Sequence, residues 1–305
     1  MLKYFHRTSQ EKTLHEHADF VEGAWIHGEG LTEAEVMLLV EKFSVEEGHL
    51  RDALDPVEVP RLEVEEGKVY VFTRVPLKTR TAVVTIPLLM VLGGDFVLTV
   101  TPEKLPLIER TMNDANIYTT QHTDFLLRLF GAINAAYARH LTEIARAVRS
   151  AQGRIERISN RDIIRFVEYG QILNDFLAAL VPTATIMRNL LKGRTLKLEE
   201  ADEELTEDVL LETGQLIETS QATLKHIVNV RDAYSTIMTH ELNRVMKMLT
   251  ALTIVFTVPT MISSFYGMNV RLPFDQNPLA YLGILMAIIL TTGLLLAVLA
   301  RNRWL

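Results

Sequence analysis

Two long uncharged stretches near the C-terminus constrain this chain more than any other feature. No charged residue occurs from Met248 to Val270, or from Gln276 to Ala300. Each stretch exceeds the roughly 20 apolar residues that an α-helix needs to cross the hydrocarbon core of a bilayer. The chain upstream of Lys247 is richly charged and has no comparable stretch. The sequence therefore predicts a soluble part of about 245 residues followed by a membrane hairpin.

The cations that flank the two spans predict their orientation. Arg244 and Lys247 precede the first span, and Arg301 and Arg303 follow the second, whereas the short connection carries one arginine and one aspartate. Because positive charge collects on the cytoplasmic side, both chain ends are expected in the cytoplasm, with the hairpin loop outside a cell membrane crossed twice. The stretch Met1–Arg7 has no apolar core segment and is not expected to be a secretory signal.

Composition narrows the classes of partner. The formal net charge is −7, which argues against nucleic acid as a partner. The chain has no cysteine, so thiolate metal sites are excluded, and a cytosolic location suits the soluble part.

The first hundred residues read as mixed α/β. A helix is predicted over 31–40, with Thr32 as its N-cap. Strands are predicted where β-branched residues lie between glycine or proline: Lys68–Val75, Phe96–Val100 and, more weakly, Ala82–Ile86. A turn at Gly93–Asp95 is expected to lead into the Phe96 strand.

After Pro106 the signals for strands stop and helical periodicity takes over. Three helices are predicted: Thr123 to about Ile158, Arg161 to about Leu191, and Glu203 to Phe265. Lys192–Arg194 is a plausible stop for the second, through Gly193. The third helix contains two breakers, Gly214 and Pro259. If it is continuous, its length of about 60 residues corresponds to roughly 90 Å, and it runs from the soluble part into the membrane.

The third helix carries a polar stripe at heptad spacing. Its members are Asp232, Thr236, Thr239, Asn243, Met246, Thr250, Thr253, Thr257, Thr260 and Ser264. A coiled coil would place apolar residues on such a seam. Threonine and serine in membrane helices also bond back to their own backbone or join helices, which is the simpler explanation for any one of them. For the whole stripe we favour water, and since two spans cannot enclose a channel, several copies must form a ring.

A second motif follows the first span. Tyr266-Gly267-Met268-Asn269 is expected to end the helix, with Gly267 in the left-handed conformation. The amide oxygen of Asn269 then lies at the membrane surface. Mg²⁺ keeps several of its waters when bound, so a ring of amide oxygens can hold a hydrated ion without binding it too tightly. The alternative is that Gly-Met-Asn is merely a cap and a turn.

These residues resemble a known family. Tyr266-Gly267-Met268-Asn269 matches the signature of the CorA magnesium/cobalt transporter family, and Asn243–Thr250, Pro259 and the ending Arg303-Trp304-Leu305 look like that family too. The stretch from Pro60 to Pro76 is similar to its cytoplasmic domain, less specifically. The resemblance covers most of the chain and is strongest in about the last hundred residues.

The resemblance implies a CorA-like homopentamer in the lipid bilayer, with a funnel-shaped α/β/α cytoplasmic domain. The expected segments are the domain at 1–202, a stalk helix at 203–247, a pore-lining span at 248–268, an outer loop at 269–278, a second span at 279–300 and a basic tail at 301–305.

The resemblance and the stripe together give the expected site residues. The outer mouth consists of Gly267, Met268 and Asn269. The pore-lining set is Asp232, Thr239, Asn243, Met246, Leu249, Thr250, Thr253, Thr257 and Thr260. At the narrow stretch the family resemblance favours Leu249 and the heptad favours Thr250, and this choice stays open. Metal contacts are expected at Asn269, at an acidic ring of Asp232, and at Asp208 as a sensor of cytosolic Mg²⁺.

The implied function is influx of a divalent cation, Mg²⁺ with Co²⁺ and Ni²⁺ as further candidates, which also regulates the channel; no other cofactor is expected. One departure from the family is the outer loop, Val270–Pro278, which carries Arg271 and no net charge. The nearest rival is a zinc transporter of the same superfamily, with His15 and His17 as ligands. A rival from another class is a membrane-anchored oligomeric scaffold. An enzyme is not expected, since the chain has no phosphate-binding loop, zinc-protease motif or nucleophile elbow.

Overall fold

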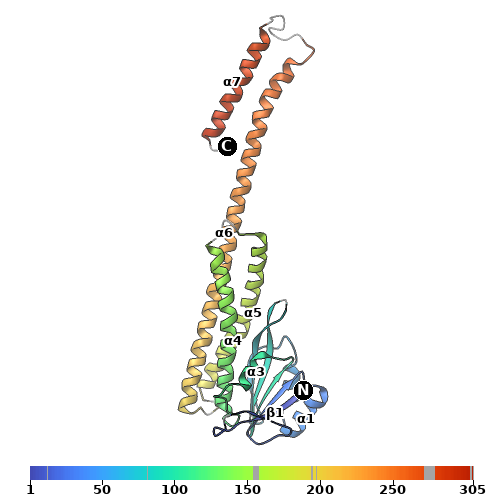
Figure 1. Ribbon diagram of the computed structural model, residues 1–305, viewed down its shortest axis with the longest axis vertical. Helices are drawn as coiled ribbons and strands as arrows, with labels where there is room; N and C mark the ends of the chain where they lie inside the picture. Colours follow the sequence, from blue (N-terminus) through green and yellow to red (C-terminus); the bar gives the residue numbers. More distant parts are fainter. Residues whose placement is uncertain are drawn as a thin grey trace. The chain divides into compact units, whose positions relative to one another are not determined.

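The computed structural model describes residues 1–11, 13–80, 82–153, 158–193, 195–196, 198–270, 279–302 and 304. The chain divides into two compact units, Met1–Val230 and Arg231–Leu305. Its elements in chain order (Figure 1) are β1 Leu2–His6, β2 His15–His17, β3 Ala24–Glu29, α1 Glu33–Phe43, α2 Glu47–Asp52, β4 Arg61–Glu65, β5 Lys68–Lys78, β6 Val83–Leu92, β7 Phe96–Thr101, α3 Pro106–Met112, α4 His122–Gln152, α5 Asn160–Leu191, α6 Glu200–Tyr266 and α7 Ala280–Arg301.

The N-terminal unit is built on one mixed sheet. Its strand order is β2-β1-β3-β7-β6-β5-β4, and the β3–β7 pair is parallel while the other pairs are antiparallel. Side chains alternate along each strand between the two faces. Tyr70 and Phe72 of β5 pack with α1 and α2, whereas Val69 and Val71 pack with α3 to α6. The predicted α/β/α layering is therefore confirmed.

Proline does not end the strands where the sequence suggested. The predicted strand ending at Val75 continues through Pro76, and the weak strand at Ala82–Ile86 runs through Pro87 to Leu92. Proline lacks a donor for the ladder, so it is tolerated only where one side of a strand is open. β4 pairs β5 only as far as Phe72, and β7 pairs β6 only as far as Leu89. Both prolines lie beyond those points, in a hairpin that extends past its neighbours.

Other local predictions agree with the structure. Thr32 caps α1 in a capping box with Glu35, and the turn before β7 closes with Gly93 N–H donating to Phe96 O at 2.9 Å. Gly193 follows α5 with φ of +65°, as expected of a helix stop. The sequence did not predict the elements β1 to β4, α2 and α3.

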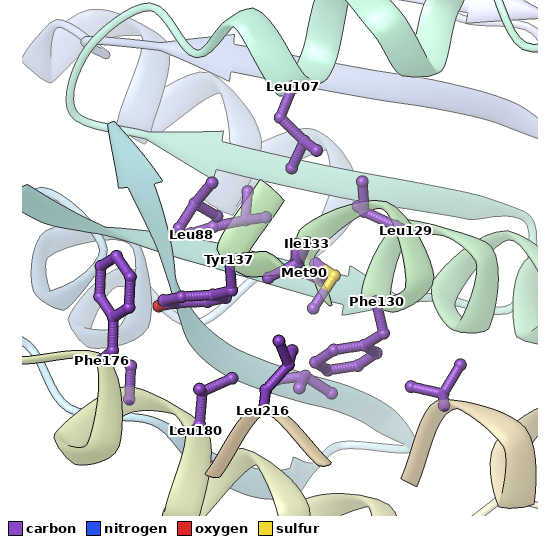
Figure 2. Close-up of a cluster of buried hydrophobic side chains, with 14 of the residues drawn as sticks. Leu88, Met90, Leu107, Leu129, Phe130, Ile133, Tyr137, Phe176, Leu180 and Leu216 are labelled. Atoms are coloured by element: carbon purple, nitrogen blue, oxygen red, sulfur yellow. The ribbon is translucent and has the colours of Figure 1, made fainter. Parts of the chain in front are cut away.

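The larger core lies between the sheet and the helices α3 to α6. Figure 2 shows Leu88 and Met90 from the sheet facing Phe130, Ile133 and Tyr137 from α4, with side chains of α5 and α6 alongside. Tyr137 is fully buried, and its hydroxyl donates to Arg74 O at 2.9 Å. Burial raises the pKa of Tyr137, so this hydroxyl keeps its proton. The first half of α6 is thus a structural part of the domain core.

One polar bridge connects α6 to α4 inside that core. Asn134 donates its side-chain amide to Val209 O at 3.1 Å and to the Thr213 hydroxyl at 3.0 Å. Both polar side chains are buried, at 3% and 0% exposure, so each needs such a partner. The bridge therefore fixes the register of α6 against α4.

The C-terminal unit consists of the second half of α6 and α7. Each of these two helices contains an 18-residue window that is long and apolar enough to cross a membrane, with mean hydropathy of 1.7 for α6 and 2.6 for α7. Only 6% of either window is buried. Ala251 on α6 is fully buried and Leu299 on α7 is nearly so. The remaining apolar surface of the unit is left for lipid or for other protein.

Candidate functional site

The polar stripe lies on a single unbroken helix. α6 passes through Gly214 and Pro259 without ending. Proline removes one intrahelical hydrogen bond and crowds the preceding turn, but a membrane helix tolerates it when nearby groups compensate. The regular spacing that the sequence predicted for the stripe is therefore present along the helix.

The stripe stays exposed where its neighbours are covered. On α6, Ala251 is buried and the row Ile254, Val255, Val258 and Ile262 is partly buried within the C-terminal unit. The stripe threonines of the same segment are exposed: Thr250, Thr253, Thr257 and Thr260. Since α7 is the other helix of this unit, it accounts for the covered face. A single chain thus leaves the polar face of its first span without protein cover.

Each stripe threonine bonds to its own helix. Thr250 donates to Met246 O at 2.8 Å, Thr253 to Leu249 O at 2.8 Å, and Thr257 to Thr253 O at 2.7 Å. Thr260, Thr236 and Thr239 make the same bond to the residue four positions earlier. This is the simpler alternative that the sequence left open, and the structure confirms it for these six residues. It also uses the hydroxyl proton, so each oxygen presents only acceptor lone pairs outward.

The structure of a single chain does not decide between the two candidates for the narrowest position of the pore. Leu249 and Thr250 are both exposed, and so are Asn243 and Met246 one to two turns earlier. The choice between Leu249 and Thr250 stays a prediction.

The Gly-Met-Asn motif follows the end of α6, but not through the expected cap. α6 ends at Tyr266, and Gly267 N–H donates to Ser263 O at 3.0 Å and Ser264 O at 3.2 Å. Among the described glycines, those with positive φ are Gly23, Gly30, Gly67 and Gly193. The left-handed conformation predicted for Gly267 is therefore wrong, and its N–H instead shares its bond between the carbonyls four and three positions earlier. A Cβ at Gly267 would lie 3.4 Å from Ser263 O, so one chain could hold alanine there.

Asn269 follows the helix end and is exposed, as are Gly267 and Met268. Its amide is thus free to contact a solvated ion or another chain. The loop residues Arg271 and Asp275 lie outside the described residues, and so do Arg303 and Leu305 of the C-terminal motif.

The predicted acidic positions are separate on the chain. Asp208 is exposed on the first half of α6. Asp232 is 69% exposed, and its carboxylate lies 4.0 Å from Arg231 Nε. Among the residues that the structure describes, no three histidine or carboxylate side chains are placed to hold one metal ion. Each predicted position therefore supplies one ligand per chain, and a ring needs several copies.

The histidines of the zinc alternative lie at the edge of the sheet. His15 and His17 are exposed on β2, and His15 Nε2 lies 3.1 Å from the Thr13 hydroxyl. His6 on β1 packs edge-on against His17, with ring centres 6.0 Å apart. In the described part of the chain these rings do not converge on one point.

Known proteins resemble this chain along its whole length. The sequence profile of the family described as CorA-like Mg²⁺ transporter protein matches residues 22–301. The cobalt/magnesium transport protein CorA of Methanocaldococcus jannaschii is 24% identical over 289 residues, which cover 92% of this chain and 90% of that protein. The complete structure of the CorA magnesium transporter from the same organism matches with a TM-score of 0.88 at 20% identity, covering 100% of this chain and 99% of that one. The full-length CmaX structure matches with a TM-score of 0.73 at 15% identity, covering 96% of each chain.

Proposed function

Because the chain belongs to the CorA-like Mg²⁺ transporter family, we propose that it forms a homo-oligomeric channel, a funnel-shaped pentamer, that carries divalent cations across the cell membrane. Mg²⁺ is the proposed cargo, with Co²⁺ and Ni²⁺ as further candidates. Both chain ends lie in the cytoplasm in this proposal, as the flanking cations indicate.

The proposed parts of the chain follow the sequence prediction. Residues 1–202 form the cytoplasmic domain and 203–247 the stalk. The first span at 248–268 lines the pore, 269–278 is the outer loop, 279–300 is the second span and 301–305 is the basic tail. The exposed stripe supports this division, since it continues along α6 from the stalk into the first span.

The pore wall is formed by the same face of each α6 helix. The proposed lining residues are Asp232, Thr239, Asn243, Met246, Leu249, Thr250, Thr253, Thr257 and Thr260. The threonine oxygens suit a hydrated cation, because their protons are already given to the helix and their lone pairs point outward. Water molecules around the ion can then donate to this wall while the ion keeps its inner shell.

The outer mouth is proposed at Gly267, Met268 and Asn269. A ring of Asn269 amides would select hydrated divalent ions. One chain has room for a Cβ at Gly267, so we attribute the presence of glycine there to close approach between copies.

Two aspartates of α6 upstream of the first span are proposed to act on cations through their charge. A ring of Asp232 carboxylates would concentrate cations at the entrance. Asp208, exposed on α6, is proposed to sense cytosolic Mg²⁺ and to favour the closed channel when occupied. If that is right, removal of Mg²⁺ loosens the oligomer; identical protease resistance with and without Mg²⁺ would count against it.

No chemical energy source is required for influx. A divalent ion that crosses a potential of 100 mV toward the negative side gains about 4.6 kcal/mol, twice the value for one charge. The membrane potential alone therefore supports accumulation.

The observation that carries this proposal is the exposed polar stripe on a helix apolar enough to span a membrane. Its test is divalent-ion flux into liposomes that contain the purified full-length protein. Mg²⁺, Co²⁺ and Zn²⁺ are offered in turn under an inside-negative potential, with Asn269→Leu as the matched variant. We expect Mg²⁺ or Co²⁺ influx in the parent protein and none in Asn269→Leu.

Two other results would overturn the proposal in different ways. Zn²⁺ flux that follows a proton gradient would place the chain with zinc transporters. An intact oligomer that passes no ion, with Asn269→Leu indistinguishable from the parent, would favour the membrane-anchored scaffold.

A further inference from the structure

A buried imidazole lies at the opposite face of the sheet from α6. His49 is on α2 and is 8% exposed, with its ring centre 4.4 Å from that of Tyr70 and 5.7 Å from that of Phe72. Its Nε2 is buried and has no hydrogen-bond partner among the described residues. A buried polar atom without a hydrogen bond is costly and calls for an explanation.

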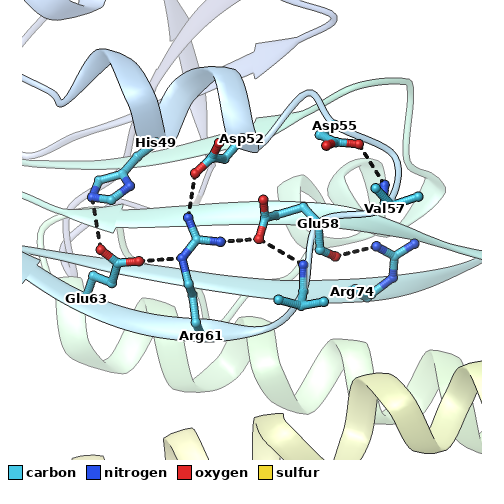
Figure 3. Close-up of polar contacts among 9 residues, drawn as sticks. His49, Asp52, Asp55, Val57, Glu58, Arg61, Glu63 and Arg74 are labelled. Atoms are coloured by element: carbon cyan, nitrogen blue, oxygen red, sulfur yellow. Dashed lines mark hydrogen bonds and ion pairs between the residues drawn. The ribbon is translucent and has the colours of Figure 1, made fainter.

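Two carboxylates face this nitrogen from the edge strand β4. Glu65 Oε2 lies 3.2 Å from His49 Nε2, and Glu63 Oε2 lies 3.6 Å from it. Residues two apart on a strand point to the same side, so both side chains reach the ring together. Figure 3 shows His49 and Glu63 facing each other across the gap between α2 and β4.

Arg61 holds one of these carboxylates in place. Its Nε donates to Glu63 Oε1, while its other nitrogens bind Glu58 and, at 2.7 Å, Asp52 (Figure 3). The guanidinium also stacks on Phe72, 3.8 Å from the ring centre. Glu63 therefore has one oxygen fixed by Arg61 and the other directed at His49, as in metal sites whose ligands are oriented by outer hydrogen bonds.

The charges around His49 are unbalanced. Asp52, Glu58 and Glu63 share the single guanidinium of Arg61. Glu65 adds a further negative charge next to His49 Nε2. The group thus has a surplus of negative charge beside a nitrogen ligand, which suits a divalent cation.

We propose that His49, Glu63 and Glu65 bind a divalent transition-metal ion, of the class Co²⁺, Zn²⁺ or Ni²⁺. Ligands of a tetrahedral ion with bonds of about 2.0–2.1 Å lie about 3.3 Å apart, which matches the two nitrogen-to-oxygen distances of 3.2 and 3.6 Å. No three such side chains in the described part of the chain already surround one point. The Glu65 side chain is 50% exposed, so it has room to adjust when the ion binds.

The site would distinguish transition metals from Mg²⁺. An imidazole nitrogen is a good ligand for Co²⁺, Ni²⁺ and Zn²⁺, whereas Mg²⁺ prefers oxygen ligands in an octahedron. The three residues all lie within the N-terminal unit. The site therefore does not depend on the proposed pore, and it gives the domain a way to report the identity of the metal in the cytosol.

The test is Co²⁺ binding to the full-length protein in detergent, followed by the visible absorption of the bound ion. To remove the other proposed metal positions, each measurement is made in a background that carries Asp208→Asn, Asp232→Asn and Asn269→Leu. We expect one Co²⁺ per chain at this site, with absorption typical of a low-coordinate nitrogen and oxygen site, and no displacement by a hundredfold excess of Mg²⁺.

The variants are His49→Gln and, because a buried change can disturb folding, Glu65→Gln at the half-exposed position. Each is expected to weaken Co²⁺ binding at least tenfold, while His15→Gln on the exposed edge strand leaves it unchanged. Equal affinity in parent and Glu65→Gln would overturn the proposal. So would displacement by Mg²⁺, or the absence of bound Co²⁺ in the parent, which would leave a direct contact between the imidazole and the carboxylates as the role of His49. None of these results depends on whether the protein passes ions.

Discussion

The two halves of α6 use the same side chains for opposite purposes. In the N-terminal unit Thr206, Thr213 and Ser220 are fully buried, and each donates to the carbonyl four residues earlier. In the C-terminal unit Thr250 and Thr257 make the same bond and are exposed. A hydroxyl at heptad spacing therefore says little by itself, and what surrounds the helix decides its role.

The surroundings differ because the first half of α6 has its partners in the same chain. α4, α5 and the sheet cover it, and the polar bridge at Asn134 completes its seam. Among the described residues of its unit, the second half has α7 as its only helical partner. The N-terminal unit thus buries its own core, whereas the C-terminal unit leaves apolar surface for lipid or for other protein.

The largest loss of stability is expected from a substitution in the core of the N-terminal unit. Tyr137→Ala removes a fully buried ring and should lower the free energy of unfolding of the N-terminal unit by about 4 kcal/mol. Tyr137→Phe keeps the ring and loses only the bond to Arg74 O, so it should cost about 1 kcal/mol. Trp25 is buried in the same core, so its fluorescence in a Trp304→Phe background measures both. A similar loss in the two variants would contradict the packing role of the ring.

The next largest effect is a loss of folding stability at low pH. His27 is buried on β3, and burial lowers its pKa to about 4 from its usual 6.5. The unfolded chain therefore binds a proton that the folded chain does not, and stability is lost as the pH falls below 6.5. Between pH 7.5 and pH 5 the loss from this residue should be about 2 kcal/mol.

His27→Gln isolates that contribution. Other groups titrate over the same range, so the measurement is the difference in pH dependence between the parent and His27→Gln, by denaturant unfolding of the full-length protein. We expect the variant to lack about 2 kcal/mol of the loss. Parallel curves would show that His27 accepts a proton in the folded state.

The sequence predicted the helical half of the molecule better than the sheet. Long helices show their periodicity over many turns of sequence. The predicted ends of α4 to α6 therefore agree with the structure within a few residues, except for the C-terminal end of α4. β3 contains Gly28 and His27, and β4 alternates charged residues along an edge of the sheet. Neither has the apolar β-branched run by which a strand is recognised in isolation.

The same distinction applies to the sites. The threonine stripe could be predicted because all of its members belong to one helix with one period. The group around His49 could not, since α2 and β4 meet only through the fold, and the spacing of His49 and Glu63 in the chain indicates nothing. The left-handed conformation of Gly267 was predicted from residue type alone, and the structure closes that helix end differently.

The third prediction concerns ion transport along the second half of α6. Thr260→Val removes one outward oxygen from the stripe while keeping the size of the side chain. We expect Mg²⁺ flux in liposomes to fall about tenfold, since an ion loses a polar contact in each copy of the ring. Thr291→Val is the matched control, because Thr291 makes the same backbone bond on α7, away from the stripe. Equal flux in the two variants would argue that the stripe does not face the ion.

The smallest effect tests the comparison directly, with one substitution made in each half of α6. Thr213→Val leaves the Asn134 amide without one of its partners in a buried seam, which should cost about 1–2 kcal/mol of unfolding free energy. Thr250→Val removes an exposed hydroxyl that bonds only to its own helix among the described residues, which should change stability by less than about 0.5 kcal/mol. Denaturant unfolding of the full-length protein measures both. If Thr250→Val proved as costly as Thr213→Val, the exposed stripe would have buried partners in the assembled protein, and the threonines would join helices rather than face water.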